Sequence, residues 1–296
     1  MIYTLTLNPS LDYVLTLKEV APAEINRADS TYITYGGKGI NVSAVLNELE
    51  VKNTALVTVA GFTGEELIKL LTKNGIKNES ILLDGQTRIN VKIKEKCETD
   101  INADGPVVTE KALDIIFGKV SKLKKDDILV LSGSTPKSNS KDIYEKIAKS
   151  TKAKVFADCE GEALLNLLKA NPYLIKPNLK EVETSLNVSV NTEEEIKNAL
   201  KLLINKGAQN VLCSMGENGA VLLTKDGEYI KQKAPKGNVI NTTGAGDSML
   251  AGFIAAHILN CGLKDCIKNA VAAGSATAFS QGLAKKQDIF SCIAKL

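Results

Sequence analysis

The chain has 296 residues, of which 44% are hydrophobic and 24% charged, and its net charge is +3 at pH 7. These values are typical of a globular protein with a sizeable core, and the small net charge does not favour nucleic-acid binding. Aromatic residues make up 4% and tryptophan is absent, so few side chains are available to stack on nucleic-acid bases. No apolar run approaches the ~20 residues that span a bilayer. Only Arg27 and Arg88 are arginines among 37 basic residues, which makes each a candidate for a specific role.

The cysteines are scattered without a C-x-x-C pair, and a single histidine, His257, is available to help bind a metal. This usage predicts buried, reduced thiols in a cytoplasmic protein rather than a disulfide framework or a zinc site. Residues 1–8 have no basic leader and alternate like a strand, so we expect no signal peptide there. The six cysteines are Cys97, Cys159, Cys213, Cys261, Cys266 and Cys292.

Short apolar strands alternate with helical patterns along most of the chain. In chain order, the patterns predict strands at 3–7 and 55–60, helices at 65–74 and 111–123, a strand at 128–131, a helix at 142–149, a strand at 155–157, a helix at 160–169, a strand at 174–176, a helix at 193–205, strands at 211–214 and 221–224, and helices at 245–260 and 264–280. Strands without polar alternation are typical of a parallel sheet covered on both faces. We therefore expect one doubly wound α/β domain over 1–296, with ligands at the carboxyl ends of its strands.

Two stretches depart from the strand–helix alternation, at about 12–33 and 88–101, where period-two patterns occur with no intervening helix. Segments so far apart in sequence can pair as a small antiparallel β lid beside the core. The alternative is a pair of surface hairpins that do not form a lid.

The second stretch carries an alternating polar series, Arg88, Asn90 and Lys92. On a strand these side chains project from one face, and the apolar residues that follow each of them take the other face and can pack on the core. A guanidinium and an ammonium on one face can bind a phosphate, with bidentate contacts from the arginine. The alternative is an ordinary edge strand whose lysines discourage aggregation.

The strongest local signal is the turn Gly244-Ala245-Gly246-Asp247 before the apolar helix predicted from 245. Its glycines let the backbone approach a ligand, and unpaired N–H groups at a helix N-terminus favour an anion such as a phosphate. Asp247 would lie beside that anion, where a carboxylate can act as a general base. The alternative is a plain helix cap by Asp247 or Ser248.

Two common nucleotide motifs are missing from the chain. No G-x-x-x-x-G-K-[ST] sequence occurs, and the glycine run at 37–39 continues to Val42 where a dinucleotide fingerprint needs its third glycine. A P-loop NTPase and a dehydrogenase are therefore both disfavoured.

With G-G-K-G-I-N at 36–41 and N-T-T-G-A-G-D-S at 241–248, the chain resembles the ribokinase-like (PfkB) carbohydrate kinases over its whole length. Smaller family signatures follow in order: N-P-S-L-D at 8–12, S-G-S-T-P at 132–136, K-P-N-L-K-E at 176–181 and S-M-G-E-N-G-A at 214–220. The T-R-I-N-V-K strand at 87–92 is similar to that of the branch acting on fructose 1-phosphate. The resemblance implies a ribokinase-like fold and ATP-dependent phosphorylation of fructose 1-phosphate at its 6-hydroxyl. Tagatose 6-phosphate and fructose 6-phosphate are the alternative substrates.

The resemblance also implies roles for individual residues. Asp247 would deprotonate the sugar hydroxyl, and the amides of Gly244, Ala245 and Gly246 would hold the transferring phosphoryl group. The sugar phosphate would contact Asp12, Gly37, Lys38, Asn41, Arg88, Asn90 and Lys92. ATP would contact Asn178, Ser214, Gly216, Gly219 and Gly246. Asn178 and Glu181 would hold Mg²⁺ through water. A homodimer through the lid is the implied assembly, with no nucleic-acid or membrane partner.

Some of these roles have plainer alternatives. Asn178 and Glu181 are three residues apart, so they could form a helix cap with an exposed glutamate, and Lys38 could be a solvated lysine. A second class of function is a non-catalytic sugar-phosphate sensor on the same scaffold. Such a sensor would typically have lost the base or the anion-binding glycines, and both are present here.

Overall fold

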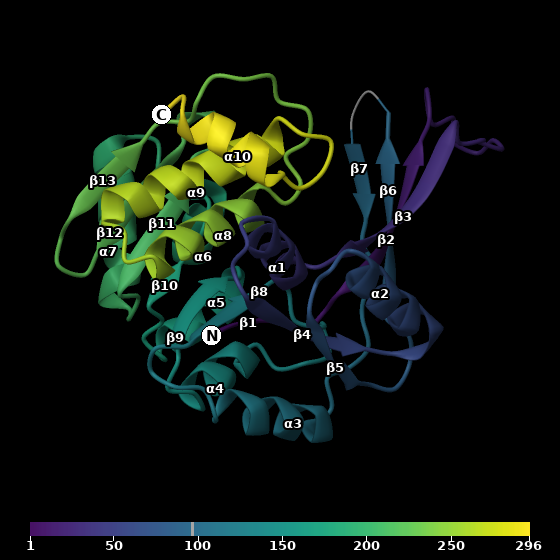
Figure 1. The fold of residues 1–296 in the computed structure, drawn as a ribbon, viewed down its shortest axis with the longest axis horizontal. Helices are drawn as coiled ribbons and strands as arrows, with labels where there is room; N and C mark the ends of the chain where they lie inside the picture. Colours follow the sequence, from purple (N-terminus) through teal and green to yellow (C-terminus); the bar gives the residue numbers. More distant parts are fainter. Residues whose placement is uncertain (96–97) are drawn as a thin grey trace.

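The computed structural model describes residues 1–95 and 98–296 and contains one large sheet with helices on both faces (Figure 1). The sheet has the strand order β13-β12-β11-β10-β9-β8-β1-β4-β5. Its strands are β1 (Ile2–Thr6), β4 (Asn53–Val59), β5 (Asn78–Leu82), β8 (Ile128–Ser132), β9 (Lys154–Asp158), β10 (Leu174–Ile175), β11 (Asn210–Ser214), β12 (Ala220–Thr224) and β13 (Tyr229–Gln232). Neighbours from β5 to β11 pair in parallel. The β11–β12 and β12–β13 pairs are antiparallel, so β12 alone of the described strands in this sheet runs in the opposite direction, and the predicted α/β fold is confirmed.

The helices form two layers because successive residues of the buried strands point to opposite faces of the sheet. Leu129 and Leu131 of β8 pack with α3, α4, α5 and α7, whereas Ile128 and Val130 pack with α1, α8, α9 and α10. The helices are α1 (Lys38–Glu48), α2 (Gly61–Lys73), α3 (Glu110–Val120), α4 (Ile143–Lys149), α5 (Gly161–Leu168), α6 (Leu179–Leu186), α7 (Glu193–Asn205), α8 (Ala245–Ile258), α9 (Leu263–Ala278) and α10 (Lys286–Ile293), with a 3₁₀ turn at Gly216–Asn218. In the described ranges, none of these helices has the length and apolar character needed to cross a membrane.

A second, four-stranded sheet stands to one side of this core and forms the lid (Figure 1). Its strands are β2 (Ser10–Thr16), β3 (Ser30–Gly36), β6 (Arg88–Lys94) and β7 (Glu98–Ile101), in the order β3-β2-β6-β7. The two distant segments do pair, so the lid prediction is confirmed over the stranded parts of 12–33 and 88–101. The expected antiparallel pairing is wrong in one respect, because β2 and β6 run parallel and each forms its own antiparallel hairpin.

The apolar side of β6 does not pack on the core as expected, because the lid is held away from the body and Ile89 is 43% exposed. By strand register, the same face of the sheet carries apolar residues from all four strands. We call these residues the lid face: Tyr13, Leu15, Ile33, Ile89, Val91, Ile93 and Ile101. The lid is therefore an amphipathic sheet with an uncovered apolar side.

The thiol prediction holds in part. Cys159, Cys213, Cys266 and Cys292 are buried free thiols, whereas Cys261 is exposed. Cys97 lies outside the described residues.

Candidate active site

Two cavities meet at the first turn of α8. The first, which we call the lid cavity, has a volume of about 400 Å³ and lies between the lid and the carboxyl ends of β1, β8 and β9. The second, the loop cavity, measures about 680 Å³ and lies between α8, α9 and the segments 214–219 and 234–242. Thr243, Gly244 and Asp247 face the first cavity, and Ala245 and Gly246 line the second. A ligand in one cavity therefore lies across this turn from a ligand in the other.

The turn itself depends on a left-handed residue. Gly244, the N-cap of α8, has φ 79°, a conformation that residues with a Cβ rarely adopt. No side chain caps this helix, so the plain-cap alternative for Asp247 and Ser248 is wrong, and the Ser248 hydroxyl donates instead to the Gly244 carbonyl. The Ala245 N–H donates to Thr242 O at 3.2 Å, whereas the N–H groups of Gly244 and Gly246 have no protein acceptor within the described residues. Such free donors at a helix start can bind an anion.

Asp247 is buried at the end of the lid cavity, with 5% of its surface exposed. Its Oδ2 accepts a hydrogen bond of 2.8 Å from Asn41 Nδ2 on α1. Burial, followed by the nearby charge of Asp158, raises the pKa of Asp247 to about 7, although Lys38, Asn41 and Lys176 favour the ionised form. A carboxyl group with that pKa can both accept and release a proton near neutral pH.

A buried ion triad lies beneath the same turn. Asp158, at the end of β9, pairs with Lys38 Nζ and Lys176 Nζ, each at 3.0 Å. Burial disfavours the charge on Asp158, but Lys176 and Lys38 outweigh it and keep the pKa of this carboxyl below its usual value. Burial also acts against the charge on Lys38, yet Asp158 and then Asp247 raise the Lys38 pKa. Lys38 is thus a charged residue that lines the cavity and pairs with Asp158, while 37% of its side chain remains exposed to solvent.

Lys176 lies directly against the turn that begins α8. A Cβ placed on Gly246 would come within 2.9 Å of Lys176 Nζ, so the glycine leaves space for the ammonium group. Asp158 and Lys176 were not among the predicted site residues. Their signal was weak but present, because each follows a short apolar strand, at the sheet edge where ligands bind.

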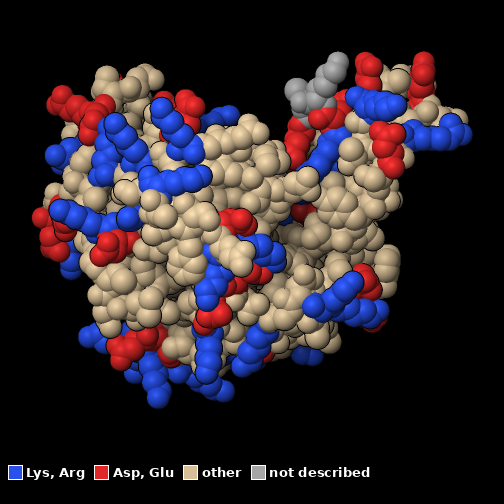
Figure 2. Space-filling model, turned by 45° about the horizontal axis from the view of Figure 1, so that its top comes forward, with Lys and Arg blue, Asp and Glu red and all other residues tan. Residues whose placement is uncertain are grey.

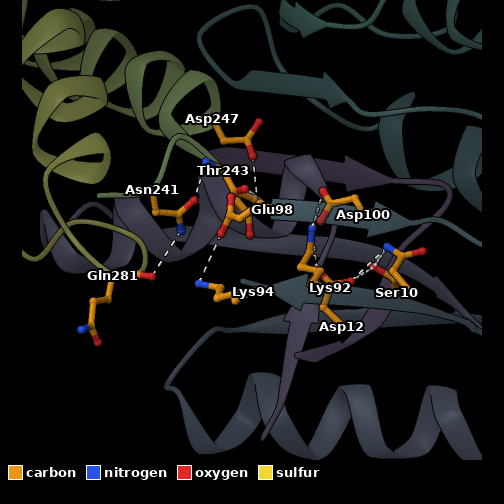
Figure 3. Close-up of polar contacts among 12 residues, drawn as sticks. Ser10, Asp12, Lys92, Lys94, Glu98, Asp100, Asn241, Thr243, Asp247 and Gln281 are labelled. Atoms are coloured by element: carbon orange, nitrogen blue, oxygen red, sulfur yellow. Dashed lines mark hydrogen bonds and ion pairs between the residues drawn. The ribbon is translucent and has the colours of Figure 1, made fainter. Parts of the chain in front are cut away.

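The lid supplies the opposite wall of the lid cavity (Figure 3). Asp12 Oδ1 accepts hydrogen bonds from Ser10 Oγ at 2.6 Å and Asn90 Nδ2 at 3.0 Å. Lys92 Nζ lies 2.9 Å from Asp100 Oδ2 and 3.8 Å from Asp12 Oδ2. The predicted polar series of β6 therefore faces the cavity.

Arg88 reaches the cavity from the root of the lid. Its Nε donates to Asn8 O and its Nη1 to Ala103 O, both at 3.2 Å. These acceptors are neutral carbonyls, so neither of these hydrogen bonds pairs the guanidinium with a carboxylate. Asn8, Thr6, Ser134 and Glu160 also line the cavity but were not predicted.

The glycine run before α1 has two different uses. Gly37 lines the lid cavity with φ 128°. A Cβ on Gly39 would lie 2.4 Å from Thr6 Oγ1 and 2.9 Å from Leu5 O, so this glycine allows α1 to pack closely on β1. The close packing brings Lys38 and Asn41 to the cavity.

Four of the residues expected to contact a nucleotide, Ser214, Gly216, Gly219 and Gly246, line the loop cavity. Asn178 lines neither cavity and forms a capping box with Glu181. The Glu181 N–H donates to Asn178 Oδ1 at 2.8 Å, and Glu181 Oε2 accepts from the Asn178 N–H at 2.9 Å. The helix cap that was the plainer alternative for Asn178 and Glu181 is therefore present. It leaves Glu181 Oε1 without a hydrogen-bond partner among the described residues.

Three comparisons relate the chain to known proteins. The model of the pfkB family carbohydrate kinases matches residues 5–289. The chain is 40% identical over 292 residues to 1-phosphofructokinase of Borreliella burgdorferi, covering 98% of this chain and 95% of that protein. It is 36% identical over 287 residues to D-tagatose-1-phosphate kinase of Bacillus licheniformis, covering 96% and 94%. The crystal structure of phosphofructokinase-2 from Escherichia coli in complex with fructose-6-phosphate has a TM-score of 0.92 at 28% identity, covering 99% and 98%.

The position of Asp247 predicts a pH-dependent rate. Only its ionised form can accept a proton, so kcat/KM should fall about tenfold per pH unit below its pKa of about 7 and level off above it. Asp247→Asn should lower kcat by ~10²–10⁴-fold. Both are measured by steady-state kinetics from pH 5.5 to 9, with melting temperature as the folding control. A near-normal kcat in a folded Asp247→Asn protein would exclude the base role.

Proposed function

Because the chain belongs to the pfkB family of carbohydrate kinases, we propose that it phosphorylates fructose 1-phosphate at the 6-hydroxyl, using ATP and giving fructose 1,6-bisphosphate. The observation that carries the proposal is the buried carboxylate of Asp247, placed beside free helix-start amides between two cavities. A sensor protein has no use for a base with a pKa near 7 at this point. The 1-phosphofructokinase named among the relatives supports the choice of sugar.

The proposed reaction is an in-line transfer across the turn of α8. The sugar phosphate binds in the lid cavity with its free 6-hydroxyl toward Asp247, and ATP binds in the loop cavity. Asp247 takes the hydroxyl proton as that oxygen bonds to the γ-phosphorus, and the bond to the β-phosphate oxygen of ADP breaks. The transition state spreads negative charge over the transferring oxygens, which the Gly244 and Gly246 amides and Lys38 are positioned to stabilise.

We place the nucleotide in the loop cavity because of its shape and composition. Val239, Val271 and Phe279 offer apolar surface for a flat base, and the glycines of the 214–219 segment let the backbone approach. Lys176 lies next to Gly246, a residue that lines the cavity, so its charge would act on phosphates that reach the turn. The expected role of Asn178 is then indirect, because its backbone lies beside that of Ser214.

Mg²⁺ is the expected metal of this reaction, and the donors fit it. Mg²⁺ retains several waters and needs only one or two carboxylates in addition to the substrate phosphates. Glu181 has one carboxylate oxygen outside its capping box, and burial followed by the charge of Asp158 raises the pKa of Glu181, which a cation would offset. We propose that Glu181, oriented by Asn178, holds Mg²⁺ through water. The metal would neutralise charge on the ATP phosphates.

The choice among sugars is tested by an ADP-release assay. We expect kcat/KM to be highest for fructose 1-phosphate in a panel with fructose 6-phosphate, tagatose 6-phosphate and ribose. Tagatose 1-phosphate is added because of the D-tagatose-1-phosphate kinase among the relatives. If another sugar phosphate has the higher kcat/KM, the proposed substrate is wrong, and if none is turned over, the proposed function is wrong.

We also propose a cytoplasmic location, in keeping with the free thiols of the described cysteines.

Arg88→Ala should weaken the binding of the sugar phosphate and not that of ATP. The guanidinium faces the lid cavity, and one charge-assisted contact contributes ~1.5–3 kcal/mol, so KM for the sugar phosphate should rise by about ten- to a hundredfold. KM for ATP should change little. An equal rise in KM for both substrates, or no rise for either, would show that Arg88 does not contact the phosphate of the sugar substrate.

Glu181→Gln should raise the Mg²⁺ concentration needed for half-maximal rate. Glutamine keeps an acceptor for the Asn178 N–H, so the helix cap survives while the charge is lost. Thr192→Ala, which removes the N-cap side chain of the next helix, α7, is the control for cap loss alone. An unchanged Mg²⁺ requirement in Glu181→Gln would leave this residue only a structural role.

We propose a homodimer through the lid face, because none of the described residues covers this apolar surface. Ile33, on the edge strand β3, is 50% exposed, and Ile33→Lys should convert the dimer to a monomer in sedimentation velocity. Ile115, 42% exposed on α3, gives the matched control Ile115→Lys, which should leave the mass unchanged. A wild-type monomer would contradict the proposal.

A further inference from the structure

Lys92 is a cation of the lid cavity whose charge is already neutralised. Its ammonium lies between two carboxylates, 2.9 Å from Asp100 Oδ2 and 3.8 Å from Asp12 Oδ2 (Figure 3). The Lys92 side chain is 15% exposed and that of Asp100 is 43% exposed. Asp12 is fixed by Ser10 and Asn90, whereas Asp100 stands on the outer strand β7 at the rim of the cavity.

Arg88 differs from Lys92 in this respect. It donates to two backbone carbonyls and has no carboxylate within 4 Å in the described part of the chain. Around the cavity as a whole, three cations, Lys38, Arg88 and Lys92, face four carboxylates, those of Asp12, Asp100, Glu160 and Asp247. Lys38 is also paired with Asp158, so Arg88 is the one of these three cations with no carboxylate within 4 Å in the described residues. A phosphate in the cavity can therefore gain a second available cation if Lys92 leaves Asp100.

We propose that Asp100 competes with the substrate's phosphate for Lys92 and thereby sets how tightly the cavity binds anions. In the ligand-free protein Asp100 occupies the ammonium group, and a sugar phosphate displaces it toward solvent. The exchange favours the substrate, because a half-exposed ion pair is weak and a phosphate offers several acceptor oxygens. A weaker anion, such as a sugar without phosphate, does not displace Asp100. This proposal rests on the proposed function, since it assumes a phosphorylated substrate.

The alternative is that the pair merely holds the β6–β7 hairpin together, and the hairpin provides its own control. Lys92 faces Asp100 and Lys94 faces Glu98 in the same cross-strand register, and Lys94 Nζ lies 3.5 Å from Glu98 Oε1. Neither Lys94 nor Glu98 lines the lid cavity. A purely structural pair should therefore respond to mutation in the same way at both positions.

The test compares Asp100→Asn with Glu98→Gln. Asp100→Asn should lower KM for fructose 1-phosphate by about three- to fivefold, the size expected for a partly exposed ion pair, and leave KM for ATP unchanged. The inhibition constant of inorganic phosphate against the sugar substrate should fall by a similar factor. Asp100→Glu, which keeps the charge, and Glu98→Gln should both resemble the wild type. An unchanged or higher KM in Asp100→Asn, or an equal change in Glu98→Gln, would overturn the proposal.

A second measurement separates this proposal from the proposed function. Calorimetric titration of inorganic phosphate into the wild type and Asp100→Asn needs no turnover. Tighter phosphate binding by the folded variant supports the competition even if the wild type fails to phosphorylate fructose 1-phosphate. Equal or weaker binding overturns the competition even if the kinase activity is as proposed.

Discussion

The site depends on one buried carboxylate. Asp158 is fully enclosed, and removing a charge from water is costly unless partners compensate. Two ammonium groups do so here, and they come from opposite sides of the site: Lys38 from the start of α1 and Lys176 from the end of β10. The arrangement fixes one cation in the lid cavity and one beside Gly246 at the start of α8. It also places a negative charge near Asp247, which helps to keep that carboxyl basic.

The same triad explains why the helix start is not capped. An N-cap carboxylate or hydroxyl at residue 244 would satisfy the free amides and fill the anion position. The left-handed Gly244 leaves those donors open, and Lys176 adds positive charge behind them. The cost of leaving donors unpaired is acceptable where a charged ligand is expected, and Gly244 lines the lid cavity. A notch separates the lid from the body on the face shown in Figure 2.

Sequence patterns predicted the features that depend on neighbouring residues. The strand–helix alternation, the glycine turn before α8 and the polar side of β6 are local and were found at the expected places. Features that depend on distant partners were missed: Lys38 and Asp158 are 120 residues apart, and nothing near either reveals the pair. The edge strands β5 and β13 and the terminal helix α10 were also missed, because edge strands mix polar and exposed residues and lack an apolar run. The parallel β2–β6 pairing follows from the path of the chain between the strands, which periodicity does not encode.

That parallel pairing has a consequence for the order of folding. Asp12 and Asn90, side by side in the lid, are 78 residues apart in sequence, and the intervening chain includes α1, β4, α2 and β5. Closing so long a loop is entropically unfavourable until the elements within it have formed. We therefore expect the main sheet to assemble before the lid, so that a late intermediate has the loop cavity but lacks the lid wall of the lid cavity. Pulsed hydrogen exchange would contradict this order if β2 and β6 were protected before β1 and β8.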